Sequence, residues 1–224
     1  MYENEIRQLI QQLAWTDDVT YYHSLRVACL LAKFTEMPAG QKFLKQAWVT
    51  QSECITAGLL HEIGKVSWPR DYLFSSDRLA QMDDETLTKF WTLKIQHPLL
   101  SERMILELYA KSGNRFWERI ARGVAAHHES FDGSGYPYGL TGTEIPLLGR
   151  GLRVFDTYVA MSEYRRYRSH FEHERVLKEM GYSLGCRFDA YWGREILAFL
   201  ESIYIENGQP CGNLDQWLEE FLAG

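Results

Sequence analysis

The sequence predicts an all-α fold, a single helical-bundle domain with about eight to ten helices. Apolar residues recur at spacings of three and four, beginning with Ile6, Leu9, Ile10 and Leu13, which is the pattern of a helix with one buried face. No stretch shows the persistent alternation of apolar and polar residues that indicates strands. The 224 residues suffice for a sizeable core, and no repeat or linker divides them.

Proline, glycine and capping residues predict where the helices of the first half begin and end. The segment Met37–Gly40 ends the second helix, and Gly64 suits a helix C-terminal cap. Asp83 or Asp84 suits an N-cap, and Pro98 suits the first turn of a helix. The expected helices span 2–14, 19–35, 41–62 (one helix or two abutting ones), 83–96 and 98–110, with an irregular stretch at 66–82.

The second half continues the helical pattern around one long loop. A helix over 114–128 ends at the double histidine His127-His128, and a loop follows over 129–145. The remaining expected helices span 146–163, 170–181, 188–206 and 213–222. We expect residues 1–18 to form a helical extension of the main domain, 19–224.

Charge and hydropathy exclude several classes of partner. The net charge of −6 argues against binding a nucleic-acid polymer, which requires clustered Lys and Arg. An anionic ligand remains compatible with this charge if metal ions or a few arginines supply local positive charge. The N-terminus lacks the pattern of a signal peptide, and no apolar run approaches the ~18 residues of a membrane span. We therefore expect a cytoplasmic protein without a membrane partner.

The cysteines give no sign of a metal or disulfide framework. Cys29, Cys54, Cys186 and Cys211 lie far apart and form no Cys-x-x-Cys motif. They are expected to be buried or incidental thiols, neither a zinc knuckle nor a disulfide frame.

The segment 127–140, His-His-Glu-Ser-Phe-Asp-Gly-Ser-Gly-Tyr-Pro-Tyr-Gly-Leu, carries the strongest functional signal. Its two adjacent histidines precede a loop in which Gly133, Gly135 and Pro137 fix unusual backbone geometry. Upstream, His61-Glu62 is a second pairing of histidine with carboxylate. A lone His-His pair is usually surface or capping decoration. Both motifs together indicate a metal site on helix ends, with a loop that presents backbone and a tyrosine to a phosphate ligand.

Enough candidate ligands are present for two metal ions, which need about six or more protein ligands. Glu62 and Asp156 supply carboxylates, and Asp156 interrupts an apolar helix, where its partner is either a metal or an arginine. His170 and His173 lie in a charged helix and are expected to be solvated. The other five histidines lie near helix ends or in core-facing helices: His23, His61, His97, His127 and His128.

Ten short motifs occur in a fixed order over about residues 20–200: His23-Ser-Leu-Arg26-Val27-Ala28, Leu59-Leu60-His61-Glu62-Ile63-Gly64-Lys65, His97-Pro98, His127-His128-Glu129, Asp132-Gly133-Ser134-Gly135-Tyr136-Pro137, Gly139-Leu140, Ile145-Pro146-Leu147, Val154-Phe155-Asp156, Arg165-Arg166-Tyr167-Arg168 and Phe188-Asp189. Together they resemble the motifs of an HD-GYP domain, a branch of the HD phosphohydrolase superfamily. The resemblance covers nearly the whole chain.

The resemblance implies a helical bundle around a two- or three-metal centre of iron or manganese. Members of that branch hydrolyse cyclic di-GMP, and some prefer cyclic GMP-AMP, giving the linear dinucleotide or GMP. Glu62 would bridge two metals, and Lys65 would face the phosphate. Tyr136, Arg165 and Arg168 would contact the dinucleotide. The implied metal ligands are His23, His61, Glu62, His97, His127, His128 and Asp156.

The same resemblance implies a mechanism and partners. Two cations would activate a bridging water for in-line attack on phosphorus and would neutralise the charge of the transition state. In some relatives the Gly-Tyr-Pro loop contacts a diguanylate cyclase (GGDEF-type) domain. Such a domain is therefore an expected partner, besides the cyclic dinucleotide. A homodimer is a separate expectation.

The chain departs from the pattern at several positions. Glu62 stands where the family has Asp, and its extra methylene would shift the bridging oxygens by roughly an ångström, which alters the centre without abolishing it. Val19 stands where members with a third metal carry Glu, which favours two metals. Val159 replaces a second Asp, and Arg166 and Ala190 replace prolines.

Three functions are compatible with these motifs. The favoured one is an active cyclic dinucleotide phosphodiesterase, because the seven ligand positions and Lys65 are all retained. The second is a degenerate member that binds the nucleotide or a partner protein with little turnover, which the exchange at Glu62 favours. The third is a phosphohydrolase of a different nucleotide.

Overall fold

A computed structural model gives the fold, and it describes residues 2–73, 79–162, 173–203 and 211–223. These residues form eleven α-helices and three 3-10 helices, and their only β-type pairings are two isolated bridges. The all-α prediction is confirmed. The elements are α1 (Glu3–Thr16), α2 (Asp18–Glu36), α3 (Pro38–Ala47), α4 (Gln51–Leu60), η1 (Ile63–Ser67), α5 (Arg70–Leu73), η3 (Leu79–Gln81), α6 (Asp84–Ser112), α7 (Arg115–Ala125), η4 (Gly142–Glu144), α8 (Leu147–Ser162), α9 (His173–Gly181), α10 (Ala190–Ser202) and α11 (Leu214–Ala223).

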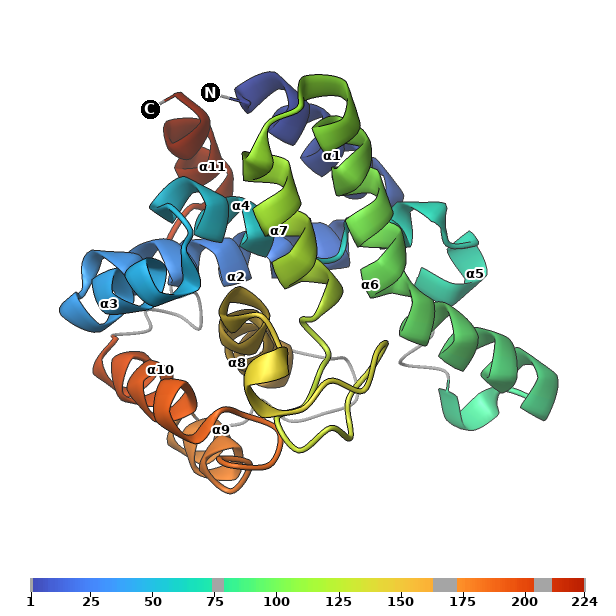
Figure 1. Cartoon of the computed structure of the whole chain (residues 1–224). Coiled ribbons are helices and arrows are strands. Elements are labelled where there is room, and N and C mark those ends of the chain that lie inside the picture. The colour runs from blue at the N-terminus through green and yellow to red at the C-terminus, as the bar shows by residue number, and fades with distance from the viewer. Residues whose placement is uncertain (1, 74–78, 163–172, 204–210, 224) are drawn as a thin grey trace.

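Helix α2 lies at the centre of the bundle and packs against α1, α3, α4, α8 and α11 (Figure 1). Gly58 allows α4 to approach it closely, because a Cβ there would lie 2.7 Å from Leu31 Cδ1 and 2.9 Å from the Cα of Ala28. This approach brings the ring of His61, just beyond α4, to 5.4 Å from the ring of His23 on α2.

Helix α6 is continuous from Asp84 to Ser112, so the prediction of two helices that meet near Pro98 is wrong. A proline inside a helix removes one backbone donor, here the N–H that would bind the carbonyl of Lys94. The Nδ1 atom of His97 lies 2.7 Å from that carbonyl oxygen and replaces the missing donor. The helix therefore continues through Pro98, and in Figure 1 its N-terminal half projects beyond the rest of the bundle.

The stretch 41–62 forms two helices, which is one of the two alternatives that its pattern allowed. Helix α3 begins at Pro38, directly after Met37 ends α2, so the predicted stop is also the next start. Trp48 ends α3 in the left-handed conformation, with φ of 57°. Thr50 then starts α4 in a capping box with Glu53.

Gly64 lies inside η1 and does not cap α4, contrary to the prediction. A Cβ at this position would collide with the carbonyl oxygen of His97 and would lie 2.7 Å from the Ser101 nitrogen. Ser101 fixes the contact, because its hydroxyl accepts from Gly64 N–H at 2.8 Å and donates to the His61 carbonyl at 2.9 Å. Glycine here holds the segment after α4 directly against α6.

The N-terminal helix packs as part of the same bundle. Ile6, Ile10 and Leu13 are at most 1 % exposed and belong to one apolar core with α2 and α4. Arg7 forms an ion pair of 2.6 Å with Glu219 on α11, which ties the two ends of the chain together (Figure 1).

Cys29 and Cys211 form a disulfide, which corrects the expectation of thiols only. Their Cα atoms lie 6.2 Å apart, and the bond joins α2 to the residues that precede α11. Their separation of 182 positions in the sequence leaves no local spacing from which the pair could be predicted. Cys54 is a buried thiol and Cys186 an exposed one.

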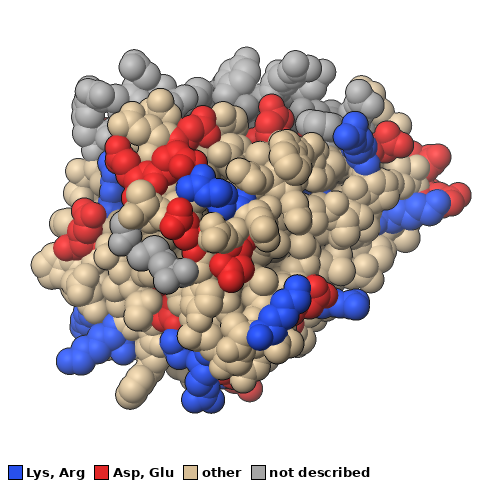
Figure 2. Space-filling model, turned by 90° about the horizontal axis from the view of Figure 1, so that it is seen from above, with Lys and Arg blue, Asp and Glu red and all other residues tan. Residues whose placement is uncertain are grey.

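Acidic and basic side chains are interspersed on the face seen from above the chain termini, with no continuous basic stripe on that face (Figure 2). Among the helices of the described segments, none is long and apolar enough to cross a membrane.

Candidate metal centre

The seven predicted ligands come from five parts of the chain and meet inside the bundle. His23 lies on α2, His61 and Glu62 join α4 to η1, His97 lies on α6, His127 and His128 follow α7, and Asp156 lies on α8. They are buried, apart from His128, whose side chain remains 11 % exposed. The helix before the double histidine ends at Ala125, earlier than predicted, which places both imidazoles in the turn beyond it.

Three of the histidines are oriented by the same backbone contact. The Nδ1 atoms of His61, His97 and His127 lie 2.8, 2.7 and 2.6 Å from the carbonyl oxygens of the residues three positions earlier. A carbonyl oxygen only accepts, so each Nδ1 carries a proton and each neutral ring has its lone pair on Nε2. Such carbonyl contacts are those that metal-ligating histidines make through their other nitrogen.

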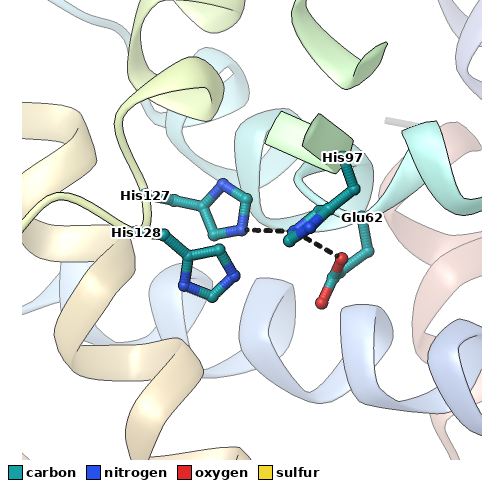
Figure 3. Close-up of side chains that lie close together, drawn as sticks. All are labelled: Glu62, His97, His127 and His128. Atoms are coloured by element: carbon teal, nitrogen blue, oxygen red, sulfur yellow. Dashed lines mark hydrogen bonds and ion pairs between the residues drawn. The ribbon is translucent and has the colours of Figure 1, made fainter. Parts of the chain in front are cut away.

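The Nε2 atoms converge on Glu62. His97 Nε2 lies 3.0 Å from Glu62 Oε2 and 3.3 Å from His127 Nε2, as the dashed lines in Figure 3 show. Neither the Glu62 Oε2 atom nor the His61 Nε2 atom has a hydrogen-bond partner, although both are buried. Lone pairs that face one another in a buried site require a cation or a proton between them.

Asp156 organises the second half of the site. Its Oδ1 atom lies 3.1 Å from His23 Nε2 and 4.0 Å from His61 Nε2, and its Oδ2 atom lies 3.9 Å from His128 Nδ1. Of the two partners open from the sequence, the histidine-lined setting fits a metal, and Arg153 reaches Asp156 only through a longer-range charge interaction.

Two ligand clusters result, and they share one residue. His23, His61, Glu62 and Asp156 can place one ligand atom each within 4.8 Å of one another, and so can Glu62, His97, His127 and His128. Opposite ligands of a first-row metal lie about 4.2 Å apart, so each cluster needs only a small contraction to close around an ion. The donor set of imidazoles and carboxylates suits iron, manganese or zinc. The residues present therefore fit a two-metal centre, with Glu62 between the two positions.

Burial favours the neutral form of three of the histidines. It lowers the pKa of His127 to about 3, with the neighbouring His61 and His97 adding to the effect. Burial also lowers the pKa of His61 and holds that of His128 well below its usual value. Neutral imidazole is the form that binds a metal, so these ligands need not lose a proton at neutral pH.

The carboxylates are held in the charged form. Burial alone would favour the neutral acid, but the charge of Lys65 holds the pKa of Glu62 well below its usual value. The pKa of Asp156 is likewise well below its usual value despite burial, chiefly because of the hydrogen bond from His23. Both acids are thus available as anionic ligands.

The fold and this geometry agree with comparison to known proteins. Residues 12–191 match the HD domain family, which is most of the chain. The chain belongs to the HD-domain family. It is similar to a cyclic di-GMP phosphodiesterase of Pseudomonas aeruginosa, with 30 % identity over 79 % of this chain and 38 % of that protein.

Two further relatives match a similar share of this chain. A cyclic di-GMP phosphodiesterase of Thermotoga maritima is 28 % identical over 79 % of this chain and 44 % of its own length. The 3'3'-cGAMP-specific phosphodiesterase 3 of Vibrio cholerae is 30 % identical over 75 % of this chain and 32 % of its own length. The chain thus spans less than half the length of each of these curated relatives.

In this HD-domain protein the loop after the double histidine is held in place by hydrogen bonds to the Glu129 side chain. The buried Glu129 carboxylate accepts the backbone N–H groups of Tyr138 at 2.7 Å and Leu140 at 3.1 Å. Gly135 packs against the backbone of Glu129, where a Cβ would collide. The loop thereby lays the ring of Tyr136 on that of His128, with centroids 4.8 Å apart.

The remaining predicted site residues lie at the edge of the centre or outside the described part. Lys65 Nζ lies 2.9 Å from Glu62 Oε1, and its side chain is 22 % exposed. Arg165 and Arg168 fall in 163–172, outside the described residues, as does His170. His173 is partly buried, contrary to the prediction. Its Nδ1 atom lies 2.9 Å from the Tyr158 hydroxyl.

Two positions that departed from the HD-GYP pattern have clear surroundings. Val19 is 58 % exposed on α2, and its side chain has no ligand atom. Val159 is 2 % exposed and belongs to the apolar core. Neither adds a ligand to the clusters.

Sequence reasoning missed Arg153, which contacts the centre directly. Its Nη1 atom donates to His128 Nδ1 at 2.9 Å, so His128 can bind a metal only when Arg153 releases this nitrogen. A signal was available, because Arg153 is the charge that interrupts the apolar face of the same helix three residues before Asp156, at a spacing that places both on one face. Ser101 was also missed, and nothing in its sequence context indicates its bridging contacts.

Proposed function

We propose that this protein is a metal-dependent phosphodiesterase that hydrolyses cyclic di-GMP, or a related cyclic dinucleotide, to the linear dinucleotide or GMP. The observation that carries the proposal is the pair of buried ligand clusters that share Glu62. Membership of the HD-domain family and about 30 % identity to cyclic di-GMP and cGAMP phosphodiesterases support the substrate class. These support an HD-GYP type of enzyme in particular.

Two divalent ions, iron or manganese, are the proposed cofactors. His23, His61 and Asp156 would hold one, His97, His127 and His128 the other, and Glu62 would contact both. When bound, such ions supply Lewis acidity toward a phosphoryl oxygen and lower the pKa of water. The chain's own contribution is to hold the ligands neutral or anionic as required, in a buried setting where charge interactions are strong.

Lys65 and Tyr136 are proposed to bind the substrate. Lys65 approaches the centre from the Glu62 side and is partly open to solvent, so its ammonium can meet an incoming phosphate. Tyr136 reaches the His128 ring from the loop on the other side. Arg165 and Arg168 remain predicted contacts of the dinucleotide. A diguanylate cyclase partner and a homodimer also remain predictions.

Turnover by protein purified without oxygen tests the proposal. With Mn(II) or Fe(II) supplied, cyclic di-GMP or 3'3'-cGAMP should give linear dinucleotide or mononucleotide, as separated by chromatography. His61→Ala should abolish the product, whereas Arg103→Ala, at a side chain 80 % exposed on α6, should not. Binding of the cyclic dinucleotide without any product would instead identify a degenerate member. Hydrolysis of other nucleotides alone would identify a different phosphohydrolase.

A further inference from the structure

Two buried polar groups beside the ligand clusters have no hydrogen-bond partner. One is the Nε atom of Arg153, and the other is the hydroxyl of Tyr136. A buried donor without a partner costs about 1–3 kcal/mol, so such groups in a folded protein call for an explanation.

Both groups belong to residues that contact His128. Arg153 binds the Nδ1 atom of His128 through Nη1, and the Tyr136 ring contacts the same ring at a tilt of 32°. The two unpartnered donors therefore belong to two residues that contact the same member of one ligand cluster.

The orientation of Arg153 leaves part of its guanidinium for a ligand. One terminal nitrogen is committed to His128, and Nε is left without a partner. The residue as a whole is only partly buried, whereas its Nε atom lies beneath the surface. A guanidinium is always charged and presents its N–H groups in a planar fork that matches the oxygens of a phosphate.

We propose that Arg153 is a phosphate-binding residue of this site, which donates Nε–H to a non-bridging oxygen of a phosphodiester while the Tyr136 hydroxyl donates beside it. This inference rests on the proposed phosphodiesterase function and adds a residue to it. Lys65 lies at Glu62 and Arg153 lies at His128, so the phosphodiester would be held between two cations at opposite members of one ligand cluster.

The chemistry favours a phosphodiester over a carboxylate or a neutral ligand. Lys65, Arg153 and two metal ions would together give the site a large positive charge, even with Glu62 and Asp156 engaged as ligands. A phosphodiester spreads one negative charge over two oxygens, so one oxygen can meet Lys65 and the other Arg153. A purely structural arginine would instead use Nε as well, as Arg150 on the same helix does when it donates to the Ile145 carbonyl at 3.1 Å.

The test uses Arg153→Gln and Arg153→Lys in the metal-loaded full chain. Affinity for the linear dinucleotide pGpG with Mn(II) is measured by calorimetry, and metal content is measured on the same samples. Loss of a charged hydrogen bond should weaken binding by about 10- to 100-fold in Arg153→Gln and less in Arg153→Lys, with the metal content unchanged. Arg150→Gln is the matched control, because it removes an arginine of the same helix that pairs with Asp189 away from the clusters.

Two outcomes would overturn the inference. Unchanged pGpG affinity in Arg153→Gln would show that Arg153 does not touch the phosphate. Loss of metal in parallel with affinity would show that Arg153 only positions His128. Failure of the proposed function gives a different result. If the wild type binds pGpG through Arg153 yet hydrolyses no cyclic dinucleotide, Arg153 is a phosphate-binding residue but the protein is not the proposed phosphodiesterase.

Discussion

The Nε2 atoms of His97 and His127 lie 3.3 Å apart, while the Nδ1 atoms of both rings donate to backbone carbonyls. In neutral rings fixed in this way, both Nε2 atoms carry lone pairs that point at each other. A cation between or beside them, shared with Glu62, removes the conflict. This contact is therefore a structural reason to expect a metal in the cluster.

Pro98 should matter for metal binding although it touches no ligand atom. Pro98→Ala restores a backbone N–H that competes with His97 Nδ1 for the Lys94 carbonyl. Loss of such an orienting contact typically lowers metal affinity by about 10- to 100-fold. Removing proline from a helix interior should at the same time stabilise the protein, by up to about 3 kcal/mol.

Metal titration and thermal unfolding of Pro98→Ala measure these opposite effects. Arg103→Ala, at an exposed position of the same helix, should change neither quantity. Unchanged metal affinity in Pro98→Ala would mean that the Lys94 carbonyl does not orient His97.

Glu62 should tolerate neither shortening nor loss of charge. Its oxygens already lie 2.9 Å from Lys65 Nζ and 3.0 Å from His97 Nε2, so Glu62→Asp withdraws them by about an ångström and should lower the rate by roughly 100-fold. Glu62→Gln should lower the metal content as well, because the shared anionic ligand is lost.

The control for Glu62 is Glu53→Gln. Glu53, at the start of α4, is also a buried carboxylate, 1 % exposed, but it pairs with Arg119 on α7. Loss of the Glu53 charge should therefore reduce stability and leave the metal content intact. Raised activity in Glu62→Asp would show instead that the native centre is detuned.

Stability of the metal-free protein should fall with pH between about 6.5 and 4.5. The folded protein holds the pKa of His127 near 3, and His61 and His128 are also lowered, whereas the unfolded histidines titrate near ~6.5. Over this window the unfolded state binds more protons, so His127 alone costs up to about 1.4 kcal/mol per pH unit as the pH falls, and His61 and His128 act in the same direction.

The carboxylates act in a lower window. The pKa values of Glu62 and Asp156 are lowered in the folded state, so their contribution is complete above their unfolded values near ~4 and is lost only below them. Denaturant unfolding in the presence of a chelator, at several pH values, measures the slope. His127→Gln should flatten it, and a wild type with constant stability from pH 6.5 to 4.5 would contradict the neutral, buried histidines.

Much of this centre could be predicted from the sequence, because each ligand belongs to a short motif with a local chemical logic. His61-Glu62 and His127-His128 follow helices whose apolar faces are readable, and Asp156 is conspicuous as a charge in an apolar helix. Helix positions also followed from periodicity and caps.

What could not be predicted depends on contacts between distant segments. The continuity of α6 through Pro98 requires the side chain of His97 to replace a backbone donor, and a local rule about proline does not foresee it. The Cys29–Cys211 bond and the Arg153–His128 contact likewise depend on packing of segments that are far apart in the chain.

The most direct test of the two-metal centre is activity toward cyclic di-GMP as a function of metal equivalents added to anaerobic, metal-free protein. Because Glu62 joins two clusters, we expect little turnover up to one Mn(II) or Fe(II) per chain, a steep rise toward two, and a plateau there. A plateau at one equivalent, or no product at any ratio, would contradict the two-metal phosphodiesterase.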